Sequence, residues 1–345
     1  MTPSIQRILF LCNAGPSVGG GHVMRCLTLA GALRARGAAC AFVASPEVSR
    51  LLAAFAGPEI ERLAGGGEDA EALTCDGLVA IADWDAGWVV VDHYGLDAEQ
   101  EQRLRGLAGR LLAMDDLLRP HHADLVLDSN LGRTAHDYPG AEVLAGSDFT
   151  LIRPAFRDLR DVALMRRATQ PDASRVLVAM GLTDVDGVTA RVLAALQPVL
   201  GERQVDVVLG GGAAGLDKVL QMAESDRRLE VHVDTRAMSA LTAAADLAVG
   251  AGGSSTWERC CLGLPAITVV LAENQRANAA ALEAAGATVA LDAGDPLFDS
   301  RLAWVFKALC ADAKRLTELS FAAASLCDGM GAERAAAKML RTRKD

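Results

Sequence analysis

The sequence has few aromatic residues and no long apolar segment. Phe, Trp and Tyr together make up 4% of the 345 residues, although apolar residues as a class make up 51%. The chain can therefore bury a large core, and we expect alanine- and leucine-rich helices to supply much of it. No apolar stretch reaches the roughly 18 residues of a membrane-spanning helix, so the sequence predicts no association with a membrane.

Basic residues are not in excess either. The formal net charge is −10 at pH 7, which argues against nonspecific binding to nucleic acid or to a membrane surface. An acidic protein can still carry a local positive site for an anionic small molecule. The eight cysteines form no Cys-x-x-Cys pair, and several lie inside apolar runs. Because no signal peptide is recognisable, we expect free thiols and a cytoplasmic location.

Two common nucleotide-binding motifs are absent. A G-x-G-x-x-G frame that starts at Gly19 needs glycine where Met24 stands, and no acidic residue ends the next predicted strand. The Gly-Lys-Ser/Thr of a phosphate-binding P-loop is absent too. The sequence therefore predicts neither a nicotinamide dinucleotide nor a P-loop phosphate site, and we expect no cofactor.

The chain does contain a regular alternation of short apolar runs and helical patterns. Strands are predicted at 8–12, 40–44, 88–92, 111–114 and 125–127, and then at 176–180, 205–209, 230–233, 247–250 and 266–270. Runs that are apolar throughout indicate strands covered on both faces, and the alternation indicates parallel sheets. The predicted fold class is α/β, with two doubly wound, Rossmann-like domains that face a cleft.

The two series are separated by a charged, interrupted segment at 153–160 and by Thr169-Gln-Pro-Asp172, which is typical of a linker. We therefore assign residues 1–155 to an N-terminal domain and residues 172–325 to a C-terminal domain. Residues 326–345 are expected to add a C-terminal helix, with packing against the N-terminal domain as one option. Ligands bind beyond the carboxyl ends of the strands in such sheets, so the site is expected there.

The first candidate site follows directly on the first predicted strand. Three glycines, Gly19-Gly20-Gly21, precede a helical pattern that opens at His22. Glycine lets the backbone approach a ligand closely, and a helix start offers unbonded N–H groups and a positive dipole end. The pattern indicates an enzyme site for an anionic substrate with a titratable imidazole, although a histidine in this place can equally cap the turn.

Polar side chains end two further predicted strands, as Asp92-His93-Tyr94 and as Asp115-Asp116, with His121-His122 shortly after. Two carboxylates and two imidazoles suggest a metal on composition alone. Adjacent residues of an extended chain point to opposite faces, however, so structural or substrate-contact roles are favoured and no metal is expected. Asp184-Val-Asp186 resembles the Asp-x-Asp of metal-dependent sugar transferases, but N-capping explains it more simply.

The second strong motif is the glycine-rich segment at 249–258. A predicted strand ends in Gly252-Gly253, and Ser254-Ser255-Thr256 then lead into a helix whose first turn holds Glu258. Unbonded N–H groups and hydroxyl donors favour an anion, and Glu258 is placed to accept from ribose hydroxyls. An ordinary helix cap is the alternative. Ala272-Glu-Asn-Gln275 follows the next strand and is expected at the same sheet edge.

In this order the motifs are similar to those of a known enzyme family. Gly-Gly-Gly-His22-Val-Met-Arg25, Val-Asp92-His-Tyr94-Gly95, Met-Asp-Asp116 and Gly-Ala-Gly-Gly-Ser-Ser-Thr-Trp-Glu258 are followed by Ala272-Glu-Asn-Gln275 and Asp328-Gly-Met-Gly-Ala-Glu-Arg334. Together they resemble the UDP-2,4-diacetamido-2,4,6-trideoxy-β-L-altropyranose hydrolases of pseudaminic acid biosynthesis. The resemblance covers nearly the whole chain.

The resemblance implies a two-domain glycosyltransferase-B (GT-B) architecture and a metal-independent hydrolysis at the anomeric carbon that releases UDP. The free sugar would serve pseudaminic acid synthesis and the glycosylation of flagellin or capsule. His22 would be the catalytic general base. The sugar would contact Gly20, Gly21, Arg25, Asp92, Tyr94, Asn274 and Gln275. The nucleotide would contact Gly252, Gly253, Ser254, Ser255, Thr256 and Glu258.

One position departs from the family pattern, and three other functions stay open. Where Met-Gly-Gly-Thr-Asp is expected, the chain has Met180-Gly-Leu-Thr-Asp184, so Leu182 adds bulk at a place of expected backbone approach. The alternatives are a UDP-sugar-dependent glycosyltransferase of the same architecture, a hydrolysing UDP-sugar 2-epimerase and a non-catalytic nucleotide-sugar-binding module. The partner expected in each case is a small-molecule UDP-sugar. The oligomeric state is left open, with a monomer as the working expectation.

Overall fold

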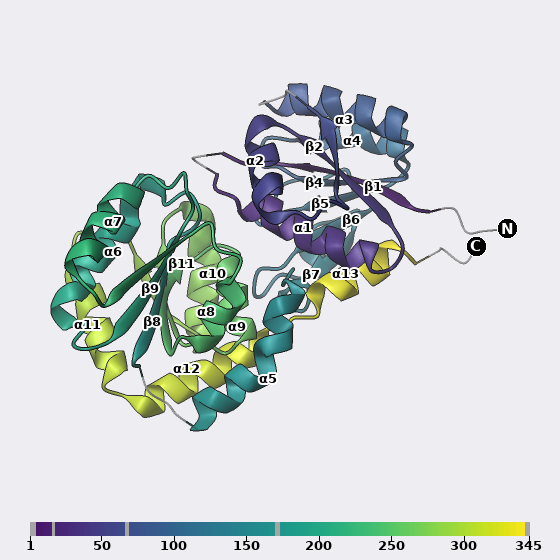
Figure 1. The fold of residues 1–345 in the computed structure, drawn as a ribbon. Coiled ribbons are helices and arrows are strands. Elements are labelled where there is room, and N and C mark those ends of the chain that lie inside the picture. The colour runs from purple at the N-terminus through teal and green to yellow at the C-terminus, as the bar shows by residue number, and fades with distance from the viewer. Residues whose placement is uncertain (1–4, 16–17, 66–68, 170–172, 342–345) are drawn as a thin grey trace. The chain divides into compact units, whose positions relative to one another are not determined.

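The computed structural model describes residues 5–15, 18–65, 69–169 and 173–341. The chain divides into two compact units. Unit 1 comprises residues 1–151 and 330–345, and unit 2 comprises residues 152–329. Each unit contains one parallel sheet with helices packed on it (Figure 1). Within the described residues, no helix is long and apolar enough to cross a membrane.

Unit 1 has a seven-stranded sheet in the order β3-β2-β1-β4-β5-β6-β7. Its strands are β1 (Arg7–Cys12), β2 (Ala39–Ala44), β3 (Glu61–Ala64), β4 (Trp88–Asp92), β5 (Leu111–Met114), β6 (Leu125–Asp128) and β7 (Glu142–Ala145). Its α-helices are α1 (Gly21–Arg34), α2 (Pro46–Phe55), α3 (Ala70–Trp84), α4 (Ala98–Ala108) and α13 (Gly331–Met339).

Unit 2 has a six-stranded sheet in the order β10-β9-β8-β11-β12-β13. Its strands are β8 (Arg175–Ala179), β9 (Gln204–Leu209), β10 (Leu229–Val233), β11 (Leu247–Ala251), β12 (Ala266–Val270) and β13 (Val289–Asp292). Its α-helices are α5 (Pro154–Thr169), α6 (Val188–Leu196), α7 (Leu216–Ser225), α8 (Met238–Ala244), α9 (Ser255–Cys261), α10 (Glu273–Ala284), α11 (Phe298–Cys310) and α12 (Ala313–Leu326).

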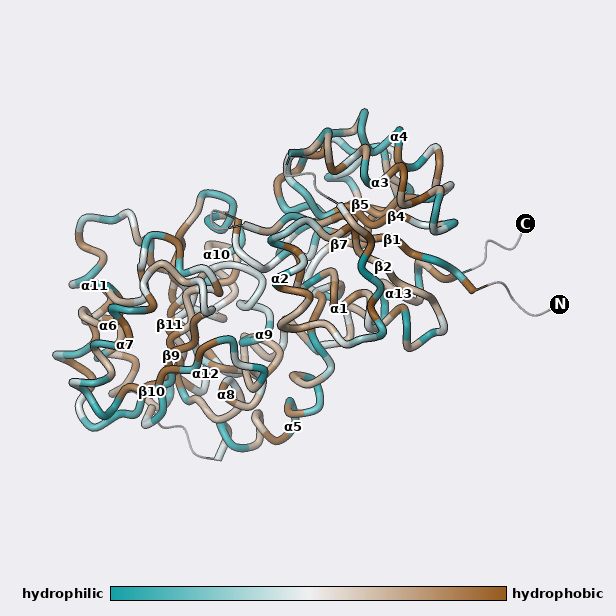
Figure 2. Tube along the Cα trace, turned by 45° about the horizontal axis from the view of Figure 1, so that its top comes forward, coloured by the Kyte–Doolittle hydropathy of each residue, from teal (hydrophilic) through white to brown (hydrophobic). Residues whose placement is uncertain are grey.

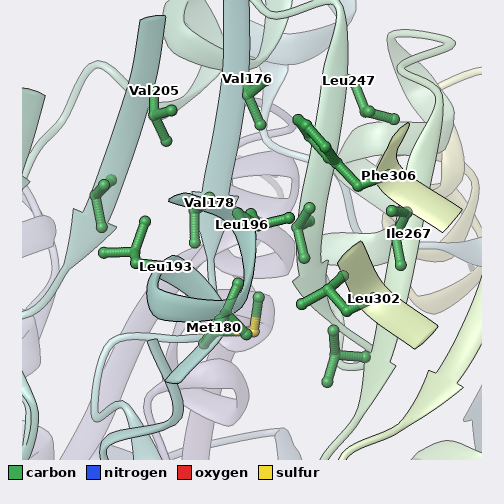
Figure 3. Close-up of a cluster of buried hydrophobic side chains, with 14 of the residues drawn as sticks. Val176, Val178, Met180, Leu193, Leu196, Val205, Leu247, Ile267, Leu302 and Phe306 are labelled. Carbon is green, nitrogen blue, oxygen red and sulfur yellow. The ribbon is translucent and has the colours of Figure 1, made fainter. Parts of the chain in front are cut away.

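Both faces of each sheet are buried, as the apolar strands predict. On β1, Ile8 and Phe10 belong to one core cluster, while Leu9 and Leu11 belong to another on the opposite face. In Figure 2 the central strands β4 and β5 are brown, which marks them as hydrophobic. Figure 3 shows the larger core cluster of unit 2, where side chains of β8, β9 and β11 pack against α6 and α11. The predicted α/β class with two parallel sheets is confirmed.

Three strands that the sequence analysis did not predict lie at sheet edges. They are β3, β7 and β13, each of four residues. None of the three is apolar throughout, and most of their residues are partly or fully exposed. An edge strand pairs on one side only and needs no continuous apolar run. The hydrophobic pattern therefore identified the covered strands and missed these.

The segment expected to be interrupted is a regular helix, α5, which belongs to unit 2. Its arginines donate to main-chain carbonyls at the ends of neighbouring helices. Arg160 donates to the carbonyl of Ala324 at 2.7 Å, near the end of α12, and Arg167 donates to that of Thr242 at 2.7 Å, near the end of α8. Cations are favoured there because the last carbonyls of a helix lack intrahelical partners. Residues 170–172 of the expected linker lie outside the described residues.

Helix α13 belongs to unit 1, although the rest of that unit ends at residue 151. Ala335, Ala336 and Met339 are fully buried in the same core cluster as Val23 and Leu29 of α1. Figure 1 shows the yellow α13 beside the purple α1. The helix that begins at the candidate site is thus held in place by a segment about 300 residues further along the chain. The tail at 342–345 lies outside the described residues.

Candidate active site

The predicted histidine lies at the carboxyl edge of the unit 1 sheet. Strand β1 ends at Cys12, which pairs in register with Asp92 at the end of β4. Helix α1 then begins at Gly21, so His22 is its second residue, and Gly20 is the residue before the helix. Gly20 is buried and Gly21 is exposed. Residues 16 and 17 of the same loop lie outside the described residues.

His22 is held by a buried carboxylate. Its Nδ1 lies 2.6 Å from Oδ1 of Asp92, which has no exposed surface. Because an ionised carboxylate only accepts, Nδ1 carries the proton and the lone pair of the neutral ring is on Nε2. Nη2 of Arg25 also lies 3.2 Å from Nδ1, but a protonated Nδ1 cannot accept, so the shorter contact to Asp92 decides the tautomer. His22 is 6% exposed, so most of its surface is shielded from bulk water.

Arg25 completes this cluster from the next turn of α1. Its Nε lies 2.6 Å from Oδ2 of Asp92 and its Nη2 lies 2.5 Å from Oδ1. Burial alone would raise the pKa of Asp92, but the charge of Arg25 and the hydrogen bonds from Arg25 and His22 hold it well below its usual range. Asp92 is therefore an anion whose two oxygens are engaged. On this geometry Asp92 holds His22 in place, and the contact with the sugar expected of Asp92 stays a prediction.

Tyr94 and Asp116 lie against the same cluster. The ring of Tyr94 meets that of His22 edge to face, with centroids 4.7 Å apart. Its hydroxyl donates to Oδ2 of Asp116 at 2.9 Å, and Nη1 of Arg25 lies 3.4 Å from the same oxygen. Within the described residues, the buried Oδ1 of Asp116 has no hydrogen-bond partner. The sequence analysis favoured a structural or substrate-contact role for Asp116 but did not name it among the sugar contacts.

Asp115, the neighbour of Asp116, belongs to a separate buried cluster. Nε2 of His121 lies 3.6 Å from Asp115 and its Nδ1 lies 2.8 Å from Glu101. Burial alone would lower the pKa of His121, but Asp115 and Glu101 raise it to about 9. The paired carboxylates thus separate onto two sides of the strand, as expected. The one group of potential metal ligands found among the described residues is Asp206, Glu230 and His232 in unit 2, where Arg175 already binds both oxygens of Asp206.

The His121 cluster predicts a stability loss in mild alkali. A histidine whose pKa is raised in the folded state stabilises the fold fully below its ordinary value, about 6.5, and that stability disappears as pH rises through about 9. The expected loss is on the order of 3 kcal/mol. Urea unfolding at pH 6, 7.5 and 9 should show it, whereas His121→Gln should be less stable at pH 6 and nearly independent of pH across this window. An equal slope in the variant would contradict the assignment.

The glycine-rich loop of unit 2 follows β11 as predicted. Gly252 is buried and its N–H donates to Val269, Gly253 and Ser255 are partly exposed, and Ser254 is exposed. Thr256 is 2% exposed, and its hydroxyl lies 3.3 Å from the carbonyl of Ala251. This bond stabilises the loop, and the nucleotide contact expected of Thr256 stays a prediction.

One acidic residue of α9 and two amide residues of α10 follow that loop in the sequence. Oε1 of Glu258 accepts from Nη2 of Arg153 at 2.8 Å and from its Nε at 3.0 Å, and the ribose contact expected of Glu258 stays a prediction. Oε1 of Gln275 accepts from the N–H of Leu271 at 3.0 Å, and its Cβ lies 3.2 Å from the place of a Cβ on Gly252. Asn274 is partly exposed on the first turn of α10. Both amide residues thus lie at the carboxyl end of β12, beside β11 in the sheet.

The atypical residue Leu182 lies in the loop after β8. Its carbonyl accepts from the N–H of Gly210 at 3.0 Å. Asp184, two residues on, is fully buried and accepts from the N–H and the hydroxyl of Thr189 in the first turn of α6. Asp184 thus bonds a helix start, in agreement with the capping interpretation.

Comparison with known proteins places the chain among nucleotide-sugar enzymes. The C-terminal domain of glycosyltransferase family 28 matches residues 187–328. The UDP-N-acetylglucosamine–N-acetylmuramyl-(pentapeptide) pyrophosphoryl-undecaprenol N-acetylglucosamine transferase of Salinibacter ruber is 32% identical over 273 residues, which are 76% of this chain and 69% of that protein.

Two further curated relatives match over shorter stretches. The UDP-2,4-diacetamido-2,4,6-trideoxy-β-L-altropyranose hydrolase of Campylobacter jejuni is 25% identical over 152 residues, 42% of this chain and 52% of that protein. The spore coat polysaccharide biosynthesis protein SpsG of Bacillus subtilis is 26% identical over 191 residues, 55% of each chain. The chain therefore spans about half the length of these two relatives.

Solved structures agree on the fold. MurG of Acinetobacter baumannii has a TM-score of 0.70 at 16% identity, over 98% of this chain and 100% of that one. The spinosyn rhamnosyltransferase SpnG, complexed with thymidine diphosphate, has a TM-score of 0.67 at 18% identity, over the same shares. At such identities the likeness shows the fold alone, and it confirms the predicted GT-B architecture. Taken with the Salinibacter relative and the family-28 match, it shows that the chain belongs to the GT-B family of nucleotide-sugar enzymes.

Proposed function

We propose that this enzyme hydrolyses a UDP-linked diacetamido-trideoxy sugar at its anomeric carbon and releases UDP and the free sugar. The observation that carries the proposal is the Asp92–His22 pair, in which a buried carboxylate fixes the imidazole in the tautomer of a general base. The Campylobacter hydrolase among the relatives supports the substrate class. The product would supply the synthesis of pseudaminic acid or a related nonulosonic acid.

The reaction needs little beyond a positioned water and a bound leaving group. Nε2 of His22 takes a proton from water as the water oxygen bonds to the anomeric carbon. The bond from that carbon to the diphosphate oxygen breaks, and its electron pair leaves with UDP. A general base of this kind contributes about 10²–10⁴-fold to the rate. Asp92 stabilises the imidazolium that forms, and Arg25 keeps Asp92 ionised.

The UDP part of the substrate is assigned to the loop of unit 2. The exposed Ser254 and partly exposed Ser255 supply hydroxyl donors, and the glycines before them leave the main chain accessible. Glu258 is assigned to the ribose through Oε2, because Oε1 is bonded to Arg153. Asn274 and Gln275 are assigned to the diphosphate or the sugar, and Gly20, Gly21, Arg25 and Tyr94 to the sugar. This donor set binds an anion without a divalent ion, so the reaction is proposed to be metal-independent.

The test is UDP release in the presence of EDTA. The purified protein should release UDP from one member of a panel of UDP-diacetamido sugars with water as the only acceptor. In ¹⁸O-water the label should enter the sugar and not UDP, because attack is at carbon. The first-formed sugar anomer should be inverted, since a single base delivers water from the face opposite UDP. Label in UDP, or strict dependence on added metal, would contradict this chemistry.

The 32% identity to the Salinibacter transferase favours a second candidate, a UDP-sugar-dependent glycosyltransferase. The same base would then take the proton of an acceptor hydroxyl. The two functions separate in the assay above, because a transferase releases UDP only when its acceptor is present. NMR of the released sugar would identify a hydrolysing 2-epimerase by a changed configuration at C2. Binding of UDP without turnover of any panel member would indicate a non-catalytic binding module.

A further inference from the structure

Arg259 of α9 is a buried cation beneath the glycine-rich loop of unit 2. It is 2% exposed, and burial lowers its pKa only to about 10, so it stays charged at neutral pH. Within the described residues it makes no ion pair, and its Nε has no hydrogen-bond partner. The adjacent carboxylate, Glu258, is bound to Arg153 instead. Glu258 attracts Arg259 but does not pair with it, and a buried charge without an ion-pair partner is costly, so an anion bound at this loop would stabilise it.

The contacts of Arg259 are all within the loop and its immediate neighbours. Nη2 lies 2.9 Å from the carbonyl of Ala251 and 2.9 Å from Oγ1 of Thr256, and Nη1 lies 3.3 Å from Oγ of Ser255. A Cβ on Gly250 would lie 2.5 Å from Nη1, so a side chain there would push the guanidinium out of its present place. The sequence thus provides a space under the loop that a single arginine fills.

We propose that Arg259 is a positioning residue for the diphosphate of a nucleoside-diphosphate sugar: its charge balances the diphosphate, and its contact orients Ser255 to donate to it. This rests on the nucleotide site of the proposed function. The two hydroxyls that Arg259 contacts are not equivalent. Thr256 directs its proton to Ala251, whereas Ser255 accepts from Arg259 and keeps its proton for a further acceptor.

A second buried arginine in unit 2 shows what a purely structural role looks like. Arg167 is 5% exposed, and its Nη groups donate to the carbonyls of Thr242, Ala245 and Leu262. Most of these carbonyls lie at the end of α8, whose dipole supplies negative charge. Arg259 belongs to the last turn of α9, but its guanidinium reaches back to Ser255 and Thr256 at the start of that helix, where a helix dipole disfavours a cation. Its placement therefore makes sense with a bound anion and not as a helix cap.

The experiment compares UDP with uridine as calorimetric probes of the wild-type protein, Arg259→Met and Arg167→Met. Arg259→Met should weaken UDP binding by about 10–100-fold and leave uridine binding unchanged. Arg167→Met should lower thermal stability but keep the wild-type ratio of UDP to uridine affinity. Ser255→Ala should lower that ratio by roughly 10-fold without loss of stability, and it carries the test if Arg259→Met does not fold.

The outcomes distinguish an error in the role of Arg259 from an error in the proposed function. A wild-type ratio of affinities in Arg259→Met, or in Ser255→Ala where the arginine variant does not fold, would overturn the role of Arg259 while the proposed function stands. Failure of the wild-type protein to bind UDP would overturn the proposed function, and the role of Arg259 with it.

Discussion

Replacing His22 with alanine or asparagine is expected to lower turnover by about 10²–10⁴-fold and to leave UDP binding unchanged. The reason is that the imidazole acts on water at the sugar, whereas UDP is assigned to a loop in the other unit. Single-turnover measurement of sugar release, with calorimetry of UDP binding, separates the two effects. His122→Ala is the matched control, because His122 also lies in unit 1 but its ring contacts Arg105 and not the cluster around Asp92. Normal turnover of the His22 variants would remove the base from the mechanism.

Replacing Asp92 with asparagine should have an effect of similar size through a different cause. The amide can donate to Nδ1 of His22, which places the ring proton on Nε2 and removes the base. Turnover should fall by about 10²–10⁴-fold, although the imidazole itself is unchanged. The variant should also be less stable by about 3–5 kcal/mol, because Arg25 loses its buried anion.

A second buried carboxylate provides the control for a loss of activity that is due to lower stability alone. Asp128 ends β6, is as buried as Asp92 and also binds an arginine, Arg133. Asp128→Asn should therefore lower the unfolding temperature but keep turnover in the folded protein. If Asp92→Asn and Asp128→Asn lost stability and activity in the same proportion, Asp92 would have no role beyond folding.

The fold could be predicted because its strands are covered on both faces. Continuous apolar runs gave β1, β4 and β12 to within one residue. The same reasoning failed at the charged segment around Arg160, where hydrogen bonds of arginines help to hold the helix in place. A single sequence does not show that these arginines donate to the carbonyls of other helices, so the segment was predicted to be irregular. The edge strands β3, β7 and β13 have at most three apolar residues in succession and are more exposed than the central strands, so their pattern was too weak to predict them.

Single residues of the site could be predicted from the sequence, but the contacts between them could not. His22 and Asp92 were identified from their places at the ends of two strands, yet they are 70 residues apart. A single sequence does not show that β1 and β4 are neighbours in the sheet, with Cys12 opposite Asp92. Asp92 was therefore assigned to the sugar. Asp116 was not named among the sugar contacts, because its contacts to Tyr94 and Arg25 appear only once β5 lies beside β4.

The place of α13 also sets the order in which this protein can mature on the ribosome. Unit 2 is one continuous stretch of chain and can fold while translation proceeds, since domains generally fold as units during synthesis. Unit 1 lacks its last core helix until residue 339 has emerged, and that helix covers the very one that carries His22. The unit to which the nucleotide is assigned can therefore fold first, and the proposed base becomes fixed only after α13 has emerged.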